Sequence, residues 1–384
     1  INRNMSKEVK TRIEGIAKSS RDFSRYDQVN KDHSYHLSEQ SNQEFDETAT
    51  VPIVDYSLRE TDPERFVREL GSAMEEIGFV ILTNHGLDNE LLGPQADEMV
   101  TRLFETNSVQ SKKNFLATRR YGSVKYGYMP MKETSNIHPD LVEGWVFCRN
   151  AFNIPQPPLF DEVEQAVDKV DVQAARSTFE GEKFWPSNHF EEFFRQVVLE
   201  ESKLIQPLIC SILRYLKAPD PSMFSKRLEL NSFGLRLNYY PPVSDEDHLA
   251  GGGRLLGHED VTILTLIPAP KAEGLQVFNR VTNKWIRVKA PPGSIIMNTG
   301  DYLQRISNDI LPSTTHRVSQ PADSSLRKKS RISVVLGVYF HHTEMLEVLS
   351  HLKPVKYPPI SVLNFHLNCT ARFYGDSWAQ IDSK

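Results

Sequence analysis

The first part of the chain alternates between strand-like and helix-like patterns of apolar residues. "VPIVDYSL" at 51–58 predicts a first strand, and "FVILTNHG" at 79–86 predicts a second strand that ends in a turn. Between them the pattern predicts a helix, with Asp62 as its cap, Pro63 at its first position and Gly78 as its stop. The apolar positions of this helix recur at intervals of three or four: Phe66, Leu70, Ala73, Met74 and Ile77.

Helical patterns return twice before the middle of the chain. One is predicted over 88–105, and a long one over 187–217, in which Pro207 is expected to cause a kink. Residues 121–160 combine prolines with many aromatics, which predicts loops and short strands. Residues 1–50 are polar and lack long apolar runs, so we expect a partly disordered extension or a peripheral helix there.

The pattern changes near residue 228, where short apolar runs with strand-like composition alternate with turn residues. We expect seven strands, in "LRLNYYP", "VTILTLIP", "GLQVFN", "KWIRVKAP", "GSIIMNTGD", "TTHRVSQ" and "RISVVLGVYF". Strands at spacings of roughly ten residues are typical of a β-sandwich or jelly roll. The triple glycine at 251–253 lacks a following helix and predicts a flexible loop, and helix and loop are expected from 344 onward.

Composition narrows the functional classes. A net charge of −5 over 384 residues argues against a nucleic-acid binder, which needs a basic face. The three cysteines, Cys148, Cys210 and Cys369, form no CxxC pair, which favours a reducing compartment over secretion. The sequence has no apolar run long enough for a transmembrane helix. We therefore expect a cytoplasmic protein that binds no membrane or nucleic acid, with import into an organelle as the alternative.

Two HxD motifs are candidate metal sites. In "GHEDVTILTL", His258 and Asp260 stand two apart at the start of a predicted strand, so their side chains are expected on one face. "HPD" at 138–140 has a proline in the middle and no strand after it, which makes His138 and Asp140 the weaker pair. A single HxD motif is also expected by chance in a chain with twelve histidines.

A third ligand is available further along the chain. His316, in "STTHRVSQ", lies on another predicted strand. Two histidines and one carboxylate make a facial triad that leaves coordination positions open, as non-haem iron(II) oxygenases require. Zinc accepts the same ligands, so the triad by itself does not select the metal.

Two further pairs are suited to an anionic ligand. In "RIS", Arg331 and Ser333 share a strand face, and a guanidinium beside a hydroxyl is suited to binding a carboxylate. A solvated arginine on a surface strand is the alternative, and "RKKS" at 327–330 is interpreted as a loop tip. Asn238 and Tyr240 in "LRLNYYPP" also share a face, although tyrosine in a strand usually serves packing.

Taken in order, these segments resemble the isopenicillin N synthase-like family of iron(II)/2-oxoglutarate-dependent oxygenases. The resemblance runs from about 51 to 345 and also includes "KYGYMP", "PDLVEGW" and "PPGSIIMNTGD". It implies a mainly β fold with flanking helices, in which a double-stranded β-helix (jelly-roll) core follows an α/β N-terminal portion. Because such enzymes are often monomers, it also implies a monomer. The expected division is an extension at 1–50, an α/β and helical support region at 51–204, the catalytic core at 205–345 and a C-terminal helix and loop segment at 346–384.

The resemblance also implies roles for individual residues. His258, Asp260 and His316 would bind Fe(II). The cosubstrate 2-oxoglutarate would contact Arg331, Ser333, Asn238 and Tyr240. With O2, such an enzyme oxidises an unactivated C–H bond of a small-molecule substrate, here expected to be a specialised metabolite, by hydroxylation, desaturation or ring closure. Candidate substrate residues are Tyr126, Tyr128, Trp145, Arg236, Arg254 and Arg305; the aromatics could equally be core residues and the arginines surface residues.

The chain departs from the family pattern at two places. Glu259 stands where threonine is commoner and is expected to point away from the metal. The interval from His316 to Arg331 is longer than usual, which we attribute to a longer hairpin at 321–328, with Arg327 as the alternative anchor. Two other functions remain open: an iron oxidase of the same fold that uses no 2-oxoglutarate, and a metal-binding jelly-roll module without catalysis.

Overall fold

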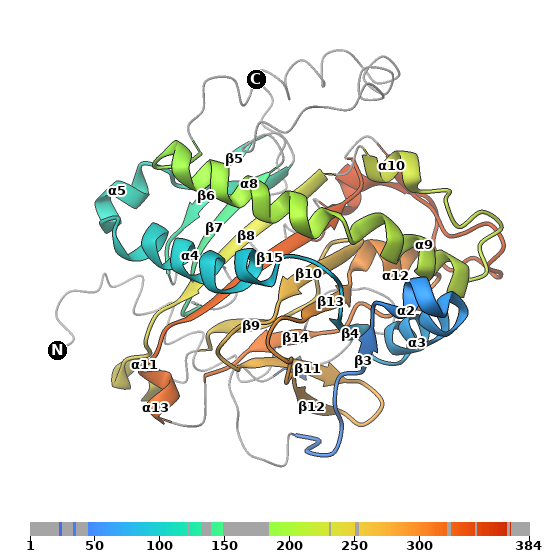
Figure 1. Ribbon diagram of the computed structural model, residues 1–384, viewed down its shortest axis with the longest axis horizontal. Coiled ribbons are helices and arrows are strands. Elements are labelled where there is room, and N and C mark those ends of the chain that lie inside the picture. The colour runs from blue at the N-terminus through green and yellow to red at the C-terminus, as the bar shows by residue number, and fades with distance from the viewer. Residues whose placement is uncertain are drawn as a thin grey trace.

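The computed structural model describes residues 23–24, 34–35, 45–120, 123–131, 140–148, 184–229, 232–249, 253–320, 324–341, 344–366 and 369 (Figure 1). Within them, a nine-stranded and a four-stranded sheet form the body of the fold, and β1 (Phe23–Ser24) with β2 (Ser34–Tyr35) and β16 (Met345–Leu346) with β17 (Ile360–Ser361) form two small pairs. No helix in the described part of the chain is long and apolar enough to cross a bilayer.

The larger sheet joins strands from both halves of the chain. Its order is β3 (Ile53–Asp55), β4 (Phe79–Thr83), β13 (Ile295–Thr299), β10 (Leu264–Pro268), β15 (Arg331–Tyr339), β8 (Ser232–Tyr240), β7 (Glu143–Cys148), β6 (Ser123–Met129) and β5 (Thr118–Arg120). The neighbours are antiparallel except β3 and β4, which are parallel. The first two predicted strands therefore form and extend one edge of this sheet.

The smaller sheet faces the larger one. Its order is β12 (Lys284–Arg287), β11 (Leu275–Asn279), β14 (His316–Val318) and β9 (Leu255–His258). One hydrophobic cluster contains residues from both sheets, among them Val277 and Val318 from the smaller and Ile267 and Ile296 from the larger. The two sheets thus form the predicted double-stranded β-helix core. All seven strands expected after residue 228 are present, and the four-residue β9 is an additional one.

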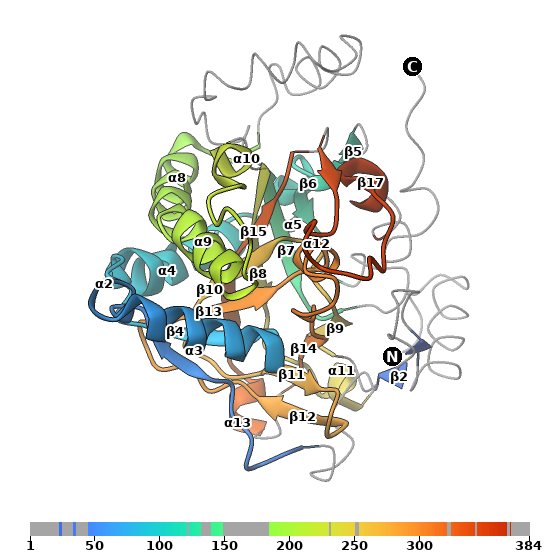
Figure 2. The same cartoon turned by 90° about the vertical axis from the view of Figure 1, so that its right-hand side faces the viewer.

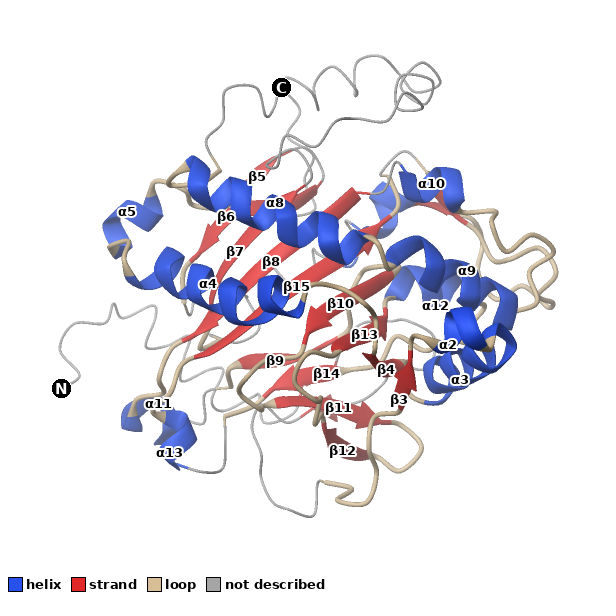
Figure 3. Cartoon of the chain, in the orientation of Figure 1, coloured by secondary structure: helices blue, strands red, loops and turns tan. Residues whose placement is uncertain are grey.

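Helices cover the other face of the larger sheet. They include α3 (Pro63–Glu76), α4 (Ala96–Glu105), α8 (Asn188–Ser202), α9 (Ile205–Tyr215) and α12 (Asp301–Ile306). Figure 2 shows α3, α4, α8 and α9 gathered on one side of this sheet, and Figure 3 shows α4 and α8 crossing over β6, β7, β8 and β15. The largest hydrophobic cluster fills the space between these helices and the sheet. Shorter helical segments are α2 (Leu58–Thr61), α5 (Val109–Lys113), α10 (Ser225–Glu229), α11 (Asp245–Leu249) and α13 (Ser324–Arg327).

The first predicted helix has the expected ends. The side chain of Asp62 accepts a hydrogen bond from the backbone N–H of Arg65, and Pro63 occupies the first helical position. Gly78 follows the helix with a φ angle of +69°, a backbone conformation that residues other than glycine rarely adopt. The chain then enters β4 directly.

Two helix predictions require correction. The segment predicted as one kinked helix at 187–217 is two helices, α8 and α9, which break at Lys203 and Leu204 before Pro207. Pro207 lies in the first turn of α9, where its missing N–H has no intrahelical acceptor in any case. The helix predicted at 88–105 begins as a π-helix at Leu91–Gln95 before α4 starts.

The connection from β14 to β15 is also not the hairpin expected at 321–328. The two strands belong to different sheets, because β14 pairs with β11 and β9, whereas β15 pairs with β10 and β8. The described part of the connection contains α13. The extra residues therefore lie in a crossover between sheets, which needs more chain than a tight turn.

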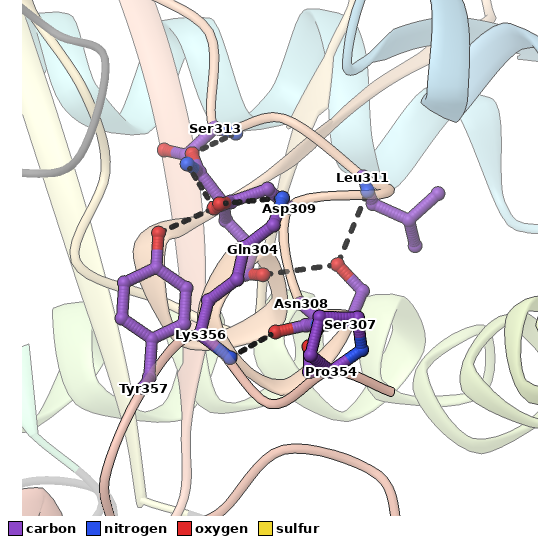
Figure 4. Close-up of polar contacts among 9 residues, drawn as sticks. All are labelled: Gln304, Ser307, Asn308, Asp309, Leu311, Ser313, Pro354, Lys356 and Tyr357. Carbon is purple, nitrogen blue, oxygen red and sulfur yellow. Dashed lines mark hydrogen bonds and ion pairs between the residues drawn. The ribbon is translucent and has the colours of Figure 1, made fainter. Parts of the chain in front are cut away.

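A polar network holds the C-terminal segment against the segment that follows α12 (Figure 4). Asn308 donates to the carbonyl of Pro354 at 2.9 Å, and the hydroxyl of Tyr357 donates to Asp309 at 2.6 Å. Gln304 on α12 contacts both Asp309 and the backbone N–H of Ser313. Since Ser313 stands three residues before His316, this network supports the chain that leads into β14.

Candidate active site

Three potential metal ligands converge between the two sheets. His258 is the last residue of β9, His316 is the first residue of β14, and the two stand opposite each other in the antiparallel register. The Oδ1 atom of Asp260 lies 3.5 Å from His258 Nε2 and 3.7 Å from His316 Nε2. These three residues form the one cluster of potential ligands found in the described part of the chain. Of the alternative HPD motif, His138 and Pro139 lie outside the described residues.

The strand alternation expected for His258 and Asp260 is wrong, although the two side chains do meet. β9 ends at His258, Asp260 lies in the following loop, and β10 begins only at Leu264 in the other sheet. The loop packs closely against Gly300, which follows β13. A Cβ atom at that position would stand only 2.2 Å from the carbonyl oxygen of Thr262, so a larger residue would not fit there. A turn between sheets, rather than a strand, therefore brings the carboxylate to the histidines.

The carboxylate of Asp260 is oriented by two strands of the larger sheet. Thr265 and Asn298, which face each other across β10 and β13, donate to its Oδ2 at 2.7 and 2.8 Å. Burial would raise the pKa of Asp260, but the imidazoles of His316 and His258 and the amide of Asn298 outweigh it and hold this pKa well below its usual range. Oδ1 thus remains available as an anionic ligand.

Sequence reasoning did not identify Thr265 and Asn298. The available signal was the presence of polar residues, Thr265 and Asn298 among them, within two mainly apolar segments, "VTILTLIP" and "GSIIMNTGD". Such residues need buried hydrogen-bond partners. Which partner each one has depends on the pairing of β10 with β13.

His316 is held in the tautomer that a metal ligand needs. Its Nδ1 lies 3.1 Å from the carbonyl oxygen of Thr314 and so donates the proton, which leaves the lone pair on Nε2. Burial and then the neighbouring His258 lower the pKa of His316 to about 4, so the ring is neutral at neutral pH. The adjacent Glu259 is buried and accepts a hydrogen bond from the hydroxyl of Thr315.

The donor set fits a divalent metal ion. Ligand atoms at about 2.1 Å from one ion and at right angles to each other stand about 3 Å apart. The two distances to Asp260 Oδ1 exceed this value by less than 1 Å. Two imidazoles and one carboxylate on the same side of the ion leave other positions open, which is the ligand set of a non-haem iron(II) centre.

The four residues expected around 2-oxoglutarate form two adjacent cross-strand pairs. In the register of β8 and β15, Arg331 stands opposite Tyr240, and Ser333 stands opposite Asn238. All four are buried. The sequence of either strand alone did not show that Arg331 would pair with Tyr240, or Ser333 with Asn238.

The guanidinium group of Arg331 has a hydrogen-bond donor that no described residue uses. Its Nε donates to the carbonyl of Ala272 at 3.2 Å, while the buried Nη1 has no hydrogen-bond partner among the described residues. Arg331 is 2% exposed, and burial lowers its pKa, though arginine stays charged at neutral pH. A buried charge without a carboxylate is costly and is suited to an anionic ligand. Arg327, the alternative anchor, lies on α13.

Two of the predicted pocket aromatics lie on the opposite face of the sheet. Trp145 stands beside Leu237, and Tyr128 beside Trp145, so both side chains face the covering helices. Trp145 is fully buried among Phe104, Phe147 and Tyr128. These contacts agree with the alternative interpretation as core aromatics. The side chain of Tyr126 lies outside the described part of the chain.

The residues that share the inner face of β6, β7 and β8 are mostly small or apolar. Gly144 stands opposite Asn238, Val146 stands opposite Arg236, and Met129 packs with Val146. Arg236 is half-buried, and its Nε donates to the side-chain oxygen of Asn238 at 2.8 Å.

The other two candidate arginines do not lie on the strands of this sheet. Arg305 lies on α12 and donates to the carbonyl of Pro358 with its guanidinium over the ring of Tyr357. Arg254 is buried just before β9. Of the arginines predicted for a substrate, Arg236 is therefore the one that shares a sheet face with the expected 2-oxoglutarate residues.

Comparison with known proteins agrees with this geometry. Residues 232–338 match the family model described as the 2OG-Fe(II) oxygenase superfamily, and residues 51–188 match the N-terminal domain described as non-haem dioxygenase in morphine synthesis. Together the two matches span more than half of the chain.

Similar proteins come from plants and fungi. The chain is 27% identical over 277 residues to Protein DMR6-LIKE OXYGENASE 1 of Arabidopsis thaliana, covering 70% of this chain and 68% of that protein. It is 26% identical over 284 residues to the 2-oxoglutarate-Fe(II) type oxidoreductase ppzC of Metarhizium majus, covering 70% and 72%.

Solved structures share the fold. A Neurospora crassa protein in complex with alpha-KG and 5-formyluracil superposes with a TM-score of 0.68 at 20% identity, covering 84% of this chain and 96% of that one. The dioxygenase for auxin oxidation 1 of Arabidopsis thaliana, in a 2-oxoglutarate complex, gives a TM-score of 0.60 at 18% identity, covering 80% and 100%. From the family matches and the converging His258, Asp260 and His316, the chain belongs to the iron(II)/2-oxoglutarate-dependent oxygenases and is a non-haem dioxygenase.

Proposed function

We propose that the space between the two sheets binds iron(II) at one end and 2-oxoglutarate toward the other. His258, Asp260 and His316 are the metal ligands in this proposal. The distal carboxylate of 2-oxoglutarate binds Arg331 with help from the neighbouring residues Ser333, Asn238 and Tyr240. The observation that carries the proposal is the buried Nη1 atom of Arg331, which has no hydrogen-bond partner among the described residues. It lies in the same barrel that brings the three potential metal ligands together.

The residues have separate tasks in this reaction. Iron(II), 2-oxoglutarate and O2 together supply an oxidant for an unactivated C–H bond. Asp260 contributes the negative charge of the ligand set, with Thr265 and Asn298 fixing its orientation. Arg331 orients the cosubstrate, and the apolar side chains between the sheets keep water away from it.

The substrate is proposed to be a small specialised metabolite. Arg236, Val146 and Met129, on the inner face of β6, β7 and β8, are the proposed contacts, with Arg236 as the cation for an acidic group. Hydroxylation, desaturation and ring closure share the same first hydrogen removal. The position of the substrate carbon relative to the metal then determines the outcome.

The remaining expectations stand as proposals. We propose a cytoplasmic monomer that binds no nucleic acid, and the division of the chain at residues 50, 204 and 345. The break between α8 and α9 near residue 204 supports the second boundary.

The ligand assignment is tested under anaerobic conditions. Adding Fe(II) and 2-oxoglutarate to the protein should produce a visible metal-to-ligand charge-transfer band, and Asp260→Ala should abolish it. Glu344→Ala is the matched control, because this carboxylate is also part-buried but pairs with Arg227 on α10. A band of normal intensity in Asp260→Ala contradicts the assignment. Substrate-dependent O2 uptake that needs no 2-oxoglutarate would favour the cosubstrate-independent oxidase instead.

A further inference from the structure

A second buried arginine lies beside the proposed cosubstrate anchor. Arg254 is 1% exposed and stands one residue before β9. Its Nη2 donates to the carbonyl of Lys329 at 2.9 Å, and its buried Nε has no hydrogen-bond partner among the described residues. It is therefore a buried cation with unused donor capacity.

The backbone places Arg254 next to Arg331. Lys329, the acceptor for Arg254, stands two residues before Arg331. Residues two apart in an extended chain are about 7 Å apart. Arg254 thus lies at the end of β9 away from His258, and its guanidinium reaches the chain just before the strand that begins with Arg331.

No protein acid neutralises this pair of guanidiniums within the described residues. Neither arginine forms an ion pair there, and Asp97, the acid that stabilises the charge of Arg331, is bound to Lys271 at 3.2 Å. Burial, and then the charge of Arg331, lower the pKa of Arg254 to about 10, so it remains charged at neutral pH. Two buried like charges destabilise each other unless an anion lies between or beside them.

A purely structural role would leave most of the guanidinium unused. The bond to the carbonyl of Lys329 needs one N–H, which an amide or an ammonium group also supplies. Burying the unpaired Nε and a full charge for one such bond is unfavourable. An anionic ligand accounts for the charge, the burial and the unused donor together.

We propose that Arg254 is a second cationic contact for the distal carboxylate of 2-oxoglutarate, acting beside Arg331. This inference rests on the proposed placement of that carboxylate at Arg331. It makes the site selective for keto acids that carry a second carboxylate, because a monoacid leaves two buried charges without a counterion.

The experiment measures binding rather than turnover. 2-Oxoglutarate and 2-oxopentanoate, which has a methyl group in place of the distal carboxylate, are titrated into the iron-loaded protein under anaerobic conditions by calorimetry. In Arg254→Met the dissociation constant for 2-oxoglutarate should rise roughly 10- to 100-fold, the effect of losing hydrogen bonds to a charged group. The constant for 2-oxopentanoate should stay within about twofold.

Two further variants make the result unambiguous. Arg280→Met is the matched control, because Arg280 also donates to one carbonyl, that of Ser313, and has an unpaired Nε among the described residues; it should leave both constants unchanged. Arg254→Lys keeps the charge and should weaken 2-oxoglutarate less than Arg254→Met does. If Arg254→Met does not fold, Arg254→Lys carries the test through its selective loss of 2-oxoglutarate affinity.

The failures of the two proposals are distinguishable. If Arg331→Met weakens 2-oxoglutarate while the Arg254 variants bind it normally, Arg254 has no role in the site and only this inference is overturned. If the Arg254 variants weaken both keto acids equally, the residue acts on the fold and the inference is likewise overturned. If Arg331→Met leaves 2-oxoglutarate binding unchanged, the proposed function fails at its anchor.

Discussion

The two faces of the larger sheet bury different kinds of side chain: apolar ones on the helix-covered face, and several polar ones on the inner face. On the helix-covered face, Trp145, Leu237 and Leu336 pack in an apolar cluster. On the inner face of the same strands lie Arg331 and Asn238. Because successive residues of a strand point to opposite faces, both sets come from the same few segments. The outer face holds the fold together, and the inner face presents polar groups whose counterparts are ligands.

Each of these two regions also contains a buried ionisable group, Glu201 on α8 and Arg331 on β15, and the two groups differ in how they tolerate burial. Glu201 on α8 is fully buried, and neither oxygen has a hydrogen-bond partner in the described part of the chain. Burial raises its pKa well above the usual range, which favours the neutral, protonated form of the carboxyl group. Arg331 has no such option, since guanidinium does not lose its proton in proteins. A buried acid can therefore be structural without a partner, whereas a buried arginine indicates an anion.

The largest effect on stability is expected on the outer face. Trp145→Ala should lower the free energy of unfolding by about 3–5 kcal/mol, the usual loss for a fully buried large aromatic. Urea denaturation measures this change. At a temperature where the variant is still folded, its affinity for Fe(II) and 2-oxoglutarate should be close to that of the original protein. A large loss of affinity in the folded variant would show that the two faces are not independent.

The opposite behaviour is expected on the inner face. Arg331→Met should weaken 2-oxoglutarate binding by about 2–5 kcal/mol, as when one partner of a buried charge pair is removed. Without the cosubstrate, the variant should be at least as stable as the original protein, because an uncompensated charge has been removed. Calorimetry and urea denaturation measure the two quantities. A destabilised variant that retains its affinity would reverse the comparison.

Glu201 provides a pH-dependent test of the outer face. Since its folded-state pKa is raised, the folded protein binds the extra proton, and stability falls as pH rises above the unfolded-state pKa. Glu201→Gln should remove this loss and so flatten the dependence, by no more than about 1.4 kcal/mol per pH unit. Urea denaturation between about pH 5 and pH 8 would measure it. The exposed Glu192→Gln on the same helix is the control.

The smallest effect is expected for the alternative anchor. Arg327 lies on α13, in the crossover between the sheets, and its carbonyl accepts from Val243. Arg327→Gln should change the free energy of 2-oxoglutarate binding by less than about 0.5 kcal/mol, as usual for the substitution of a partly exposed residue. A loss comparable to that of Arg331→Met would move the anchor to Arg327.

Local patterns accounted for much of this molecule. The capped helix after Asp62, the seven strands after residue 228 and the placing of Arg331 and Ser333 on one face all follow from spacing within a few residues. Helix caps and strand alternation depend on near neighbours in the chain, so they can be read from the sequence. The order of the motifs also identified the family, because it needs no knowledge of the third dimension.

Only the tertiary structure decided which groups meet. It set His258 opposite His316, turned Trp145 toward the helices, brought Thr265 and Asn298 to Asp260, and placed Arg254 beside Arg331. These outcomes depend on the order of strands in each sheet and on which face of each strand is covered. Both are set by packing between segments far apart in the chain, and alternation along one strand is the same for either choice of face.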